Sequence, residues 1–271
     1  MRHTFNSTLT VSLLLLACLA QPLRADEVGD KGRAIFNKNR QAVVTVQVVQ
    51  KTTDRSGPKE AKQDLTGTVI DPSGLTVLAL SAADPAELYR RLSESYKTEV
   101  ELSDIKILLE DGQEVPAEIV LRDKDLDLAF LRPKSKLATP MTAIDLSKSG
   151  TAQVLDEVVT LNRLKRGAGR AFSASVERIS AVVQKPRTFY IPDSGMSETG
   201  MGSPAFNLNG SLLGIFVMRA VNAQGASNLR DCLSAIILPA EDILKAAAQA
   251  PEAKGGDEKK SAPKEVKEPA K

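Results

Sequence analysis

The chain has 271 residues, of which 42% are hydrophobic, so it is long enough to bury a full core, most simply as one two-lobed domain. Aromatic residues make up 4% and Trp is absent, which argues against stacking platforms for nucleic-acid bases or sugars. The formal net charge of +2 gives no reason to expect a nucleic acid or an acidic partner.

Residues 1–25 have the pattern of a secretory signal peptide. A short basic start is followed by an apolar stretch at 11–20, which is too short to serve as a permanent membrane anchor. Cleavage after Ala25, or after Ala20, would release a soluble protein. The alternative is a lipoprotein signal, in which Cys18 would carry a lipid anchor. We favour simple cleavage, and both alternatives predict an exported protein, periplasmic or secreted.

The sequence contains one histidine, His3, which lies inside the predicted leader. The mature protein would then hold no histidine, which excludes a Ser-His-Asp triad, a Cys-His pair and a His-ligated metal site. Removal of the leader also leaves Cys232 as the only cysteine, so no intramolecular disulfide is expected. Cys232 lies in an apolar run, where we favour a buried inert thiol over a reactive one.

The first half of the chain predicts a helix followed by strands. Residues 26–40 are polar and predict a helical lead-in, and the β-branched run at 42–49 predicts the first strand. The charged stretch at 51–63 contains a Gly-Pro pair and is interpreted as a surface loop. At 67–83, two apolar runs flank an Asp-Pro-Ser-Gly turn at 71–74, which predicts a hairpin.

Residues 84–103 predict a surface insertion with a short amphipathic helix, capped by Asp84 and begun by Pro85. Strands resume at 105–109 and 115–121, and the stretch 122–131 ends in another apolar strand that begins just after Asp127. The Lys/Pro/Ser-rich residues 133–140 mark a boundary between lobes. Further strands are predicted at 144–147, 156–161, 172–183 and 188–191.

Gly167, Ala168 and Gly169 are bracketed by basic residues and could cradle an anion, but a solvated loop tip is the interpretation we favour. Residues 199–215 contain a Gly-rich loop and two apolar strands around an Asn-Gly pair, a strong hairpin signal. Residues 240–250 predict a closing helix with Ile243 and Leu244 facing inward. The Lys/Glu/Pro-rich tail at 251–271 cannot bury enough apolar surface to fold and is predicted to be disordered.

Three of these segments, at 67–83, 122–131 and 199–215, resemble in order the landmarks of trypsin-like serine proteases, most closely the HtrA (DegP-like) branch. The resemblance implies an all-β fold, a trypsin-like double antiparallel β-barrel with a short helical insertion and a C-terminal helix. It implies one domain at 26–245, with lobe one at about 41–135, lobe two at about 142–239 and the active-site crevice between them. Relatives usually continue into a PDZ domain, for which the remaining residues are too few.

The resemblance also assigns the triad positions. Counting from the turn glycine places Ser81 at the histidine position, and Asp127 falls on the aspartate position. Met201 falls on the nucleophile position, where a thioether cannot attack a carbonyl carbon. Thr199 replaces the glycine whose N–H donates to the oxyanion in relatives. The triad is therefore predicted to be degenerate.

Two of these residues also have simpler interpretations. Taken alone, Ser81 could be a strand-end hydroxyl that bonds to the backbone. An Asp before a buried strand commonly caps its turn by accepting backbone N–H bonds, and we favour this role for Asp127 over a catalytic one. We expect Ser81 to donate its hydroxyl to Asp127. The resemblance further implies that Val217, Met218 and Arg219 form an edge for an extended peptide. Alternatively, these three residues continue a core strand and the insertion covers the crevice.

Three functions remain open. The first, which we favour, is a catalytically inactive HtrA-like protein (a pseudoprotease) of the cell envelope that binds or scaffolds a peptide or protein. The second is a serine endopeptidase with a relocated nucleophile, Ser203 or Ser197, and a lysine as base. The third is a purely structural envelope protein whose tail carries the interactions. We expect no nucleic acid, cofactor or metal, and membrane contact only through a lipid on Cys18.

Overall fold

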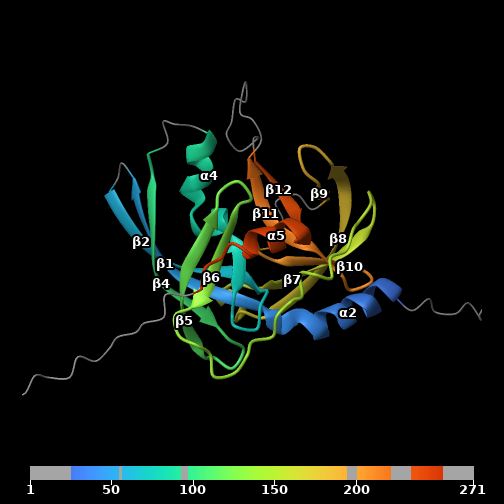
Figure 1. The fold of residues 1–271 in the computed structure, drawn as a ribbon, viewed down its shortest axis with the longest axis horizontal. Helices are drawn as coiled ribbons and strands as arrows, with labels where there is room; N and C mark the ends of the chain where they lie inside the picture. The colour runs from blue at the N-terminus through green and yellow to red at the C-terminus, as the bar shows by residue number, and fades with distance from the viewer. Residues whose placement is uncertain (1–25, 55–56, 93–96, 194–199, 221–232, 253–271) are drawn as a thin grey trace, which may run out of the picture.

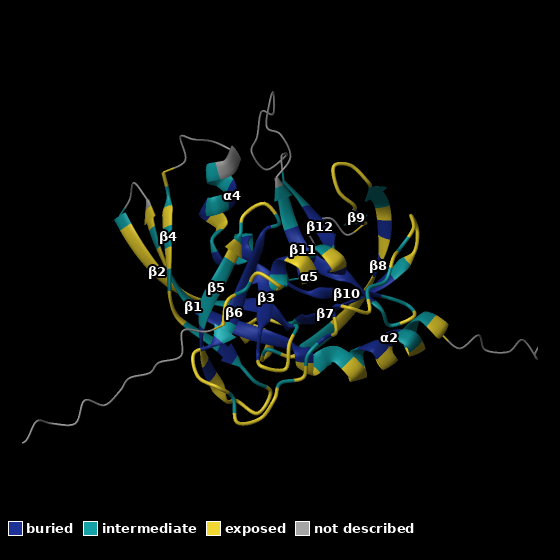
Figure 2. Cartoon of the chain, viewed as in Figure 1, coloured by how far each residue is buried: buried dark blue, intermediate teal, exposed yellow. Residues whose placement is uncertain are grey.

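The computed structural model describes residues 26–54, 57–92, 97–193, 200–220 and 233–252. These residues form two closed antiparallel β-barrels of six strands each, which lie side by side in Figure 1. Buried residues, dark blue in Figure 2, fill both barrels, and one hydrophobic cluster joins side chains from the two. The predicted double-barrel fold is confirmed. None of the described helices is long and apolar enough to cross a bilayer.

The first barrel has the strand order β1-β2-β3-β6-β5-β4. Its first strand is rich in valine, a β-branched residue that favours extended backbone, and most of these valines are buried in the barrel. The turn between β2 and β3 closes with a hydrogen bond from the Gly74 N–H to the Asp71 carbonyl at 2.9 Å. The strands are β1 Val43–Asp54, β2 Gly57–Val69, β3 Thr76–Ala79, β4 Glu99–Leu108, β5 Glu114–Asp123 and β6 Leu128–Pro133.

The surface loop predicted at 51–63 is wrong. β1 and β2 stay paired as far as Asp54 and Gly57, and they form a ribbon that extends beyond the barrel (Figure 1). The charged side chains of β2 in this ribbon are exposed, so they remain hydrated while the backbones pair. Gly57 has a φ of +100° and pairs with Asp54 as the first residue of β2, so it does not break a strand.

The helical insertion after the first hairpin is present but shorter than predicted. α3 (Leu80–Ala83) and α4 (Pro85–Leu92) are helices, and the Asp84 carboxylate between them accepts a hydrogen bond from the Glu87 N–H at 3.1 Å. β4 begins at Glu99, well before the strand predicted at 105–109, because the exposed ribbon of β1 offers it a pairing partner from Thr53 onward. From Glu99 to Leu102 the residues alternate between exposed glutamates and half-buried apolar residues, the pattern of a strand with one face in water.

The second barrel has the strand order β10-β11-β12-β9-β8-β7. The predicted hairpin at its centre is confirmed: β10 and β11 pair around the turn at Gly210, whose φ is +80°. The strand predicted at 144–147 is wrong, since these residues lie outside both sheets with Ile144 and Leu146 buried against the core. The strands are β7 Glu157–Arg163, β8 Phe172–Val183, β9 Phe189–Pro192, β10 Pro204–Asn207, β11 Leu212–Ala220 and β12 Leu233–Pro239.

Helices close the fold at both ends. α2 (Glu27–Asn39) is the predicted lead-in helix; Asp26 caps it by accepting from the Gly29 N–H at 3.0 Å, and it contacts β7 and β8. α5 (Ala240–Ala247) is the predicted closing helix and packs on β11 and β12. Ile243 is buried as expected, but Leu244 is 44% exposed, so its predicted inward orientation is wrong. Short 3-10 turns lie at Arg40–Ala42 and Arg166–Ala168.

Beyond α5, the described chain ends against the first barrel. The Arg132 side chain donates to the Pro251 carbonyl at 2.8 Å and approaches the Glu252 carboxylate at 3.3 Å. The start of the predicted tail is therefore held by contacts with β6. Cys18, Cys232, Ser197, Thr199, the predicted leader and the rest of the tail lie outside the described residues.

Candidate functional site

Ser81 and Asp127 meet where the first barrel faces the second. β3 and β6 pair as far as Ala79 and Leu128, which brings Ser81, two residues after β3, close to Asp127, the residue before β6. The Ser81 hydroxyl donates to Asp127 Oδ2 at 2.7 Å, and the Ser81 N–H donates to Oδ1 at 2.6 Å. The hydrogen bond expected from the Ser81 hydroxyl to Asp127 is confirmed.

The Asp127 carboxylate also reaches the second barrel. Its Oδ2 accepts a hydrogen bond from the backbone N–H of Met218, on β11, at 2.7 Å. Asp127 is only 5% exposed and has a φ of +58°, a left-handed conformation that Asp tolerates better than most residues. The carboxylate therefore joins the two barrels and accepts backbone N–H groups, as a turn-capping residue does.

The predicted peptide-binding edge lies on β11. Val217 is buried, Met218 and Arg219 are half-buried, and the Arg219 guanidinium stacks 4.7 Å from the centre of the Phe189 ring. The N–H of Met218 is already donated to Asp127, so it is not available to a bound peptide. The N–H and carbonyl of Phe216 are likewise used by the Ser203 carbonyl and the Gly202 N–H. Binding at this edge stays a prediction, and these contacts limit its free main-chain groups.

Met201 occupies a tight loop that the second barrel presents to the first. Next to it, Gly202 has a φ of +94°, and a Cβ added there would overlap the backbone carbonyl oxygen of Thr66. The hydroxyl of Thr68 donates to the Gly202 carbonyl at 2.8 Å, which ties the loop to β2. Met201 is half-buried and packs against hydrophobic clusters on both sides. The glycine lets the loop approach the first barrel closely and sets the place of Met201.

Ser203, a candidate relocated nucleophile, is fully buried at 0% exposure. Its hydroxyl donates to Asn162 Oδ1 at 3.2 Å, and the Thr66 hydroxyl donates to the same oxygen at 2.7 Å. Ser203 directly precedes β10, Asn162 lies on β7 and Thr66 lies on β2, so the three residues form a polar contact between the barrels. An amide oxygen is not a base strong enough to take the serine proton.

A cavity of about 650 Å³ lies between the barrels beside this contact. We call it the crevice cavity. Its volume is in the range of small-ligand and peptide pockets. Met201 and Ala82 both line it, so the nucleophile-position loop and the segment after Ser81 face one space. Its lining residues are Gln50, Gln63, Leu65, Thr66, Ala82, Pro85, Asn162, Arg163, Leu164, Lys165, Gly200 and Met201.

A family model described as a trypsin-like peptidase domain matches residues 65–215, which is more than half of the chain. The chain belongs to the trypsin-like peptidase domain family. This trypsin-like domain is also 26% identical over 165 residues to the putative protease Do-like 14 of Arabidopsis thaliana, with 59% of this chain and 36% of that protein covered. The chain thus spans about a third of that relative's length, and the match supports the HtrA branch.

The fold is similar to a solved structure as well. The crystal structure of the MamO protease domain from Magnetospirillum magneticum, in its apo form, matches with a TM-score of 0.50. It is 17% identical in sequence, and the match covers 78% of this chain and 97% of that chain. At this identity the likeness concerns the fold alone, and it agrees with the two closed barrels described above.

An ion pair also links the two barrels of this trypsin-like domain. Arg170 approaches Asp64 at 2.7 Å, and Gln47 donates to the same carboxylate at 3.1 Å. Burial raises the pKa of Asp64, but the hydrogen bonds from Arg170 and Gln47 and the charges of Arg170 and Lys165 together outweigh it, so the pKa lies below its ordinary value. Lys165 donates to the Asp64 carbonyl at 3.1 Å. Two of the basic residues around the predicted Gly-x-Gly loop are therefore bound to β2.

This ion pair predicts a pH dependence of stability. Because the pKa of Asp64 is lower in the folded state, its contribution is present above the unfolded value of about 3.9 and is lost as the pH falls through the folded value. The free energy of unfolding should therefore drop more steeply below pH 4 in the wild type than in Asp64→Asn. Urea unfolding between pH 3 and pH 6 measures this. Parallel profiles for the two proteins would show that the pair adds no pH-dependent stability.

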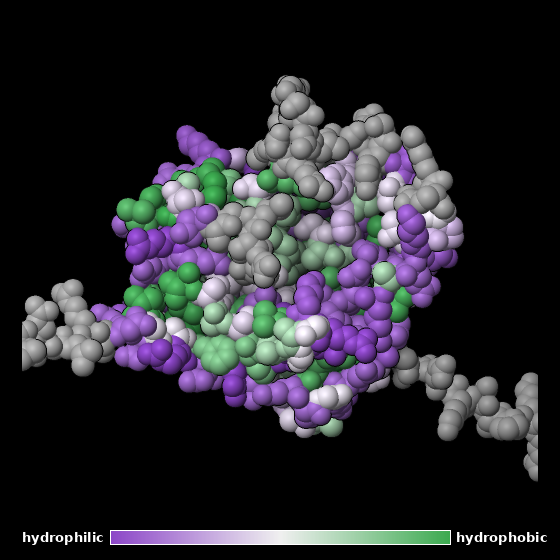
Figure 3. Space-filling model, turned by 180° about the vertical axis from the view of Figure 1, so that it is seen from behind, coloured by the Kyte–Doolittle hydropathy of each residue, from purple (hydrophilic) through white to green (hydrophobic). Residues whose placement is uncertain are grey.

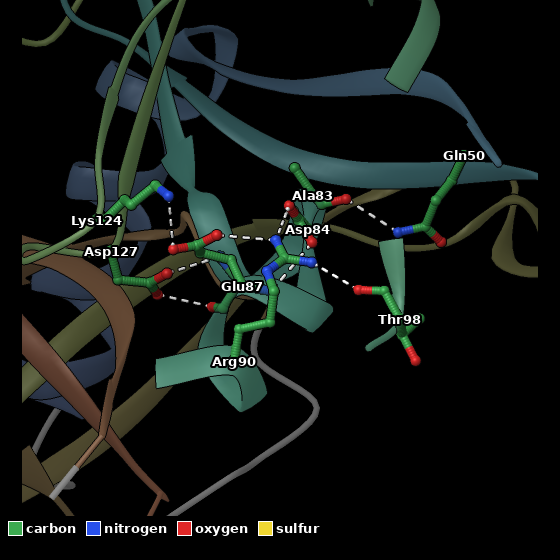
Figure 4. A network of polar contacts seen from close by, with 9 residues as sticks. Gln50, Ala83, Asp84, Glu87, Arg90, Thr98, Lys124 and Asp127 are labelled. Carbon is green, nitrogen blue, oxygen red and sulfur yellow. Dashed lines mark hydrogen bonds and ion pairs between the residues drawn. The ribbon is translucent and has the colours of Figure 1, made fainter. Parts of the chain in front are cut away.

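Charged side chains fix α4 beside the crevice (Figure 4). Arg90 binds the Asp84 and Glu87 carboxylates at 2.9 and 2.8 Å and donates to the Thr98 carbonyl at 2.7 Å. Lys124, from the loop before β6, approaches Glu87 at 2.9 Å. Burial raises the pKa of Glu87, but hydrogen bonds from Arg90 and Lys124 outweigh it and lower that pKa overall. The network holds one wall of the crevice in place.

The outer surface of the trypsin-like domain is mixed in polarity. Viewed from behind, hydrophobic areas lie among hydrophilic side chains (Figure 3). Among the exposed large hydrophobic residues is Leu164, which is 37% exposed and lines the crevice cavity. Leu164 and Asn162, two residues before it, were not predicted as site residues from the sequence. A polar residue inside the apolar run of β7 was the available signal, since a buried amide must find partners.

Proposed function

We propose that the protein is a non-hydrolytic member of the trypsin-like peptidase family that binds extended protein or peptide segments in the crevice between its barrels. The observation that carries the proposal is the contact between the Ser81 hydroxyl and the Asp127 carboxylate, at 2.7 Å. By resemblance these are the histidine and aspartate positions of the triad. A serine that donates to the aspartate fills the place of the base without being one.

The chemistry of the crevice supports the proposed loss of hydrolysis. A serine hydroxyl holds its proton at neutral pH, so Ser81 cannot take a proton from an attacking group. The thioether of Met201, at the position of the nucleophile, has no acidic proton to lose. The Asp127 carboxylate accepts from three donors of the fold, which suits a structural role.

A relocated nucleophile has little support. Ser203 is fully buried, and its hydroxyl donates to the amide oxygen of Asn162. A nucleophile must reach the substrate and have a base within hydrogen-bond distance, and this contact provides neither. Ser197, the other candidate, lies outside the described residues.

The proposal includes export to the cell envelope, either as a periplasmic or as a secreted protein. Its support is the signal-peptide pattern of residues 1–25. A membrane anchor would enter only through a lipid on Cys18. The proposed partner is an unfolded or extended segment of another protein, and no cofactor or nucleic acid is needed for the proposed role.

Fluorescent casein, an unfolded protein, tests binding and cleavage in one experiment. We expect anisotropy to rise on titration with the full chain, and gels to show no casein fragments after long incubation. Filling the crevice cavity with Ala82→Trp should weaken binding about tenfold or more, because the indole occupies the space of the ligand. Ala138→Trp, at an exposed position in the connector between the barrels, is the matched control and should bind like the wild type.

Each part of the proposal has an outcome that would overturn it. Casein fragments from the wild type, together with labelling of Ser203 by a fluorophosphonate, would establish a relocated nucleophile. Equal binding by Ala82→Trp and Ala138→Trp would place the binding surface outside the crevice. The same experiment on a chain ending at Glu252 separates a crevice function from a function of the tail, because the crevice is unchanged in that truncation.

A further inference from the structure

Asn162 is a polar residue at the heart of the crevice. It lies near the end of β7, is 8% exposed, and lines the crevice cavity together with Gly200 and Met201. An amide buried to this degree loses hydrogen bonds to water and needs partners in the protein or in a ligand. The partners of its two polar atoms therefore indicate what the residue does.

The oxygen of the Asn162 amide is fully used inside the protein. It accepts from the Thr66 hydroxyl at 2.7 Å, from the Ser203 hydroxyl at 3.2 Å and from the Arg163 N–H at 2.7 Å. A hydroxyl can donate or accept, but a backbone N–H can only donate, so the contact with Arg163 requires the oxygen at this place. The orientation of the amide is fixed by this donor.

The nitrogen of the same amide is left for the cavity. No described residue accepts a hydrogen bond from Asn162 Nδ2, and this atom is not among the buried side-chain atoms that lack a partner. It therefore retains contact with solvent, and the side chain lines the crevice cavity. Asn162 thus holds an NH2 group at the cavity that is positioned before any ligand arrives, and such preorganised donors bind acceptors with little ordering cost.

The charge of the lining favours an anionic acceptor. Arg163 and Lys165 line the cavity, and no Asp or Glu does. Two acidic residues adjoin lining residues in sequence, and both are already paired: Asp64 with Arg170 and Asp84 with Arg90. Arg163 has no ion pair with any described carboxylate, and its guanidinium stacks 4.0 Å from the centre of the Phe172 ring. Burial, the largest effect, lowers the pKa of Arg163, although the charge of Glu110 acts in the opposite direction. An anion in the cavity would therefore further stabilise the charge of this partly buried guanidinium.

The remaining lining is apolar and includes the exposed Leu164 next to Lys165. We propose that the crevice cavity binds an acidic extended peptide, with the Asn162 Nδ2 group donating to a Glu or Asp carboxylate and an apolar side chain of the peptide packing on Leu164 and Met201. This inference rests on the proposed binding function and names the class of ligand. Arg163 and Lys165 raise the local potential that attracts the carboxylate, an effect that salt screens.

Asn162→Asp tests the donor and the charge of the cavity together. The carboxylate keeps an oxygen for the Thr66, Ser203 and Arg163 donors, while it removes the NH2 group and adds a negative charge. The probes are two fluorescein-labelled peptides of the sequence Gly-Ser-Leu-X-Leu-Ser-Gly, with X either Glu or Lys. We expect the wild type to bind the Glu peptide about tenfold more tightly than the Lys peptide, and Asn162→Asp to reverse that order.

A second variant and a salt series complete the test. Lys165→Gln changes an exposed side chain, and it should reduce the preference for Glu several-fold while the fold is retained. Raising NaCl from 50 mM to 500 mM should shrink the preference in the wild type, since the Debye length falls with ionic strength. Thermal unfolding of each variant confirms that binding is compared between folded proteins.

The possible outcomes distinguish failure of the acidic-ligand proposal from failure of the proposed binding function. Equal affinity of the wild type for the two peptides, with casein still bound, would overturn the acidic ligand and leave the binding function standing. An unchanged Glu preference in both Asn162→Asp and Lys165→Gln would remove the crevice cavity as the place of recognition. Failure of the wild type to bind either peptide or casein would overturn both proposals.

Discussion

Asp127→Ala is expected to lower the free energy of unfolding by about 3 kcal/mol. The substitution leaves the Ser81 hydroxyl, the Ser81 N–H and the Met218 N–H without their common acceptor at a site that is 5% exposed. Each buried donor without a partner costs about 1–3 kcal/mol, and water entering the space of the lost carboxylate would offset part of the sum. Urea unfolding followed by circular dichroism measures the change.

Two further variants show whether the carboxylate itself is responsible. Ser81→Ala removes one donor and leaves two in place, so it should cost about 1 kcal/mol. Asp125→Ala, at an exposed position of the same loop, should cost less than about 1 kcal/mol. A more stable Asp127→Asn variant, or equal losses for Asp127→Ala and Asp125→Ala, would mean that Asp127 has no stabilising role between the barrels.

Much of the fold could be predicted because local signals and tertiary structure agree. The valine-rich run at 42–49 and the Asn209-Gly210 turn encode their strands and hairpin without help from distant residues. The prediction of secondary structure failed where residues without a clear pattern of their own take their conformation from the elements they pack or pair with. At 51–63 the charges indicated a loop, but a ribbon of two exposed strands needs only paired backbones. At 144–147 apolar and polar residues alternate, which indicated a strand, but Ile144 and Leu146 pack on the core from outside both sheets.

The candidate site was predicted in part. The contact of Ser81 with Asp127 was predicted because the resemblance to trypsin-like proteases assigns these residues to two triad positions that lie together in that fold. The donation from Met218 to Asp127 and the contact of Thr66 with Asn162 join different barrels, and no sequence spacing encodes such a contact. The approach of the barrels decides which main-chain groups remain free. For this reason the Met218 N–H on the predicted edge is already hydrogen-bonded to Asp127. For the same reason Asn162, which was not predicted, lines the crevice cavity.

That close approach leads to the second large effect. Gly202→Ala is expected to lower the free energy of unfolding by about 4 kcal/mol, or to prevent folding, for two reasons that add. The residue has a φ of +94°, which strains any residue with a Cβ, and the new Cβ would overlap the Thr66 carbonyl oxygen of the first barrel. Backbone atoms cannot move aside as a flexible side chain can, so the loop bearing Met201 would have to withdraw from the crevice.

Gly112→Ala separates the two causes. Gly112 has a φ of +84°, close to that of Gly202, and nothing lies within 4 Å of an added Cβ, so only the backbone strain of about 1–2 kcal/mol applies. The difference between the two variants measures the steric cost of the contact between barrels. If both substitutions cost the same, the loop has room to shift. The position of Met201 would then not depend on this glycine, and neither would the shape of the crevice cavity.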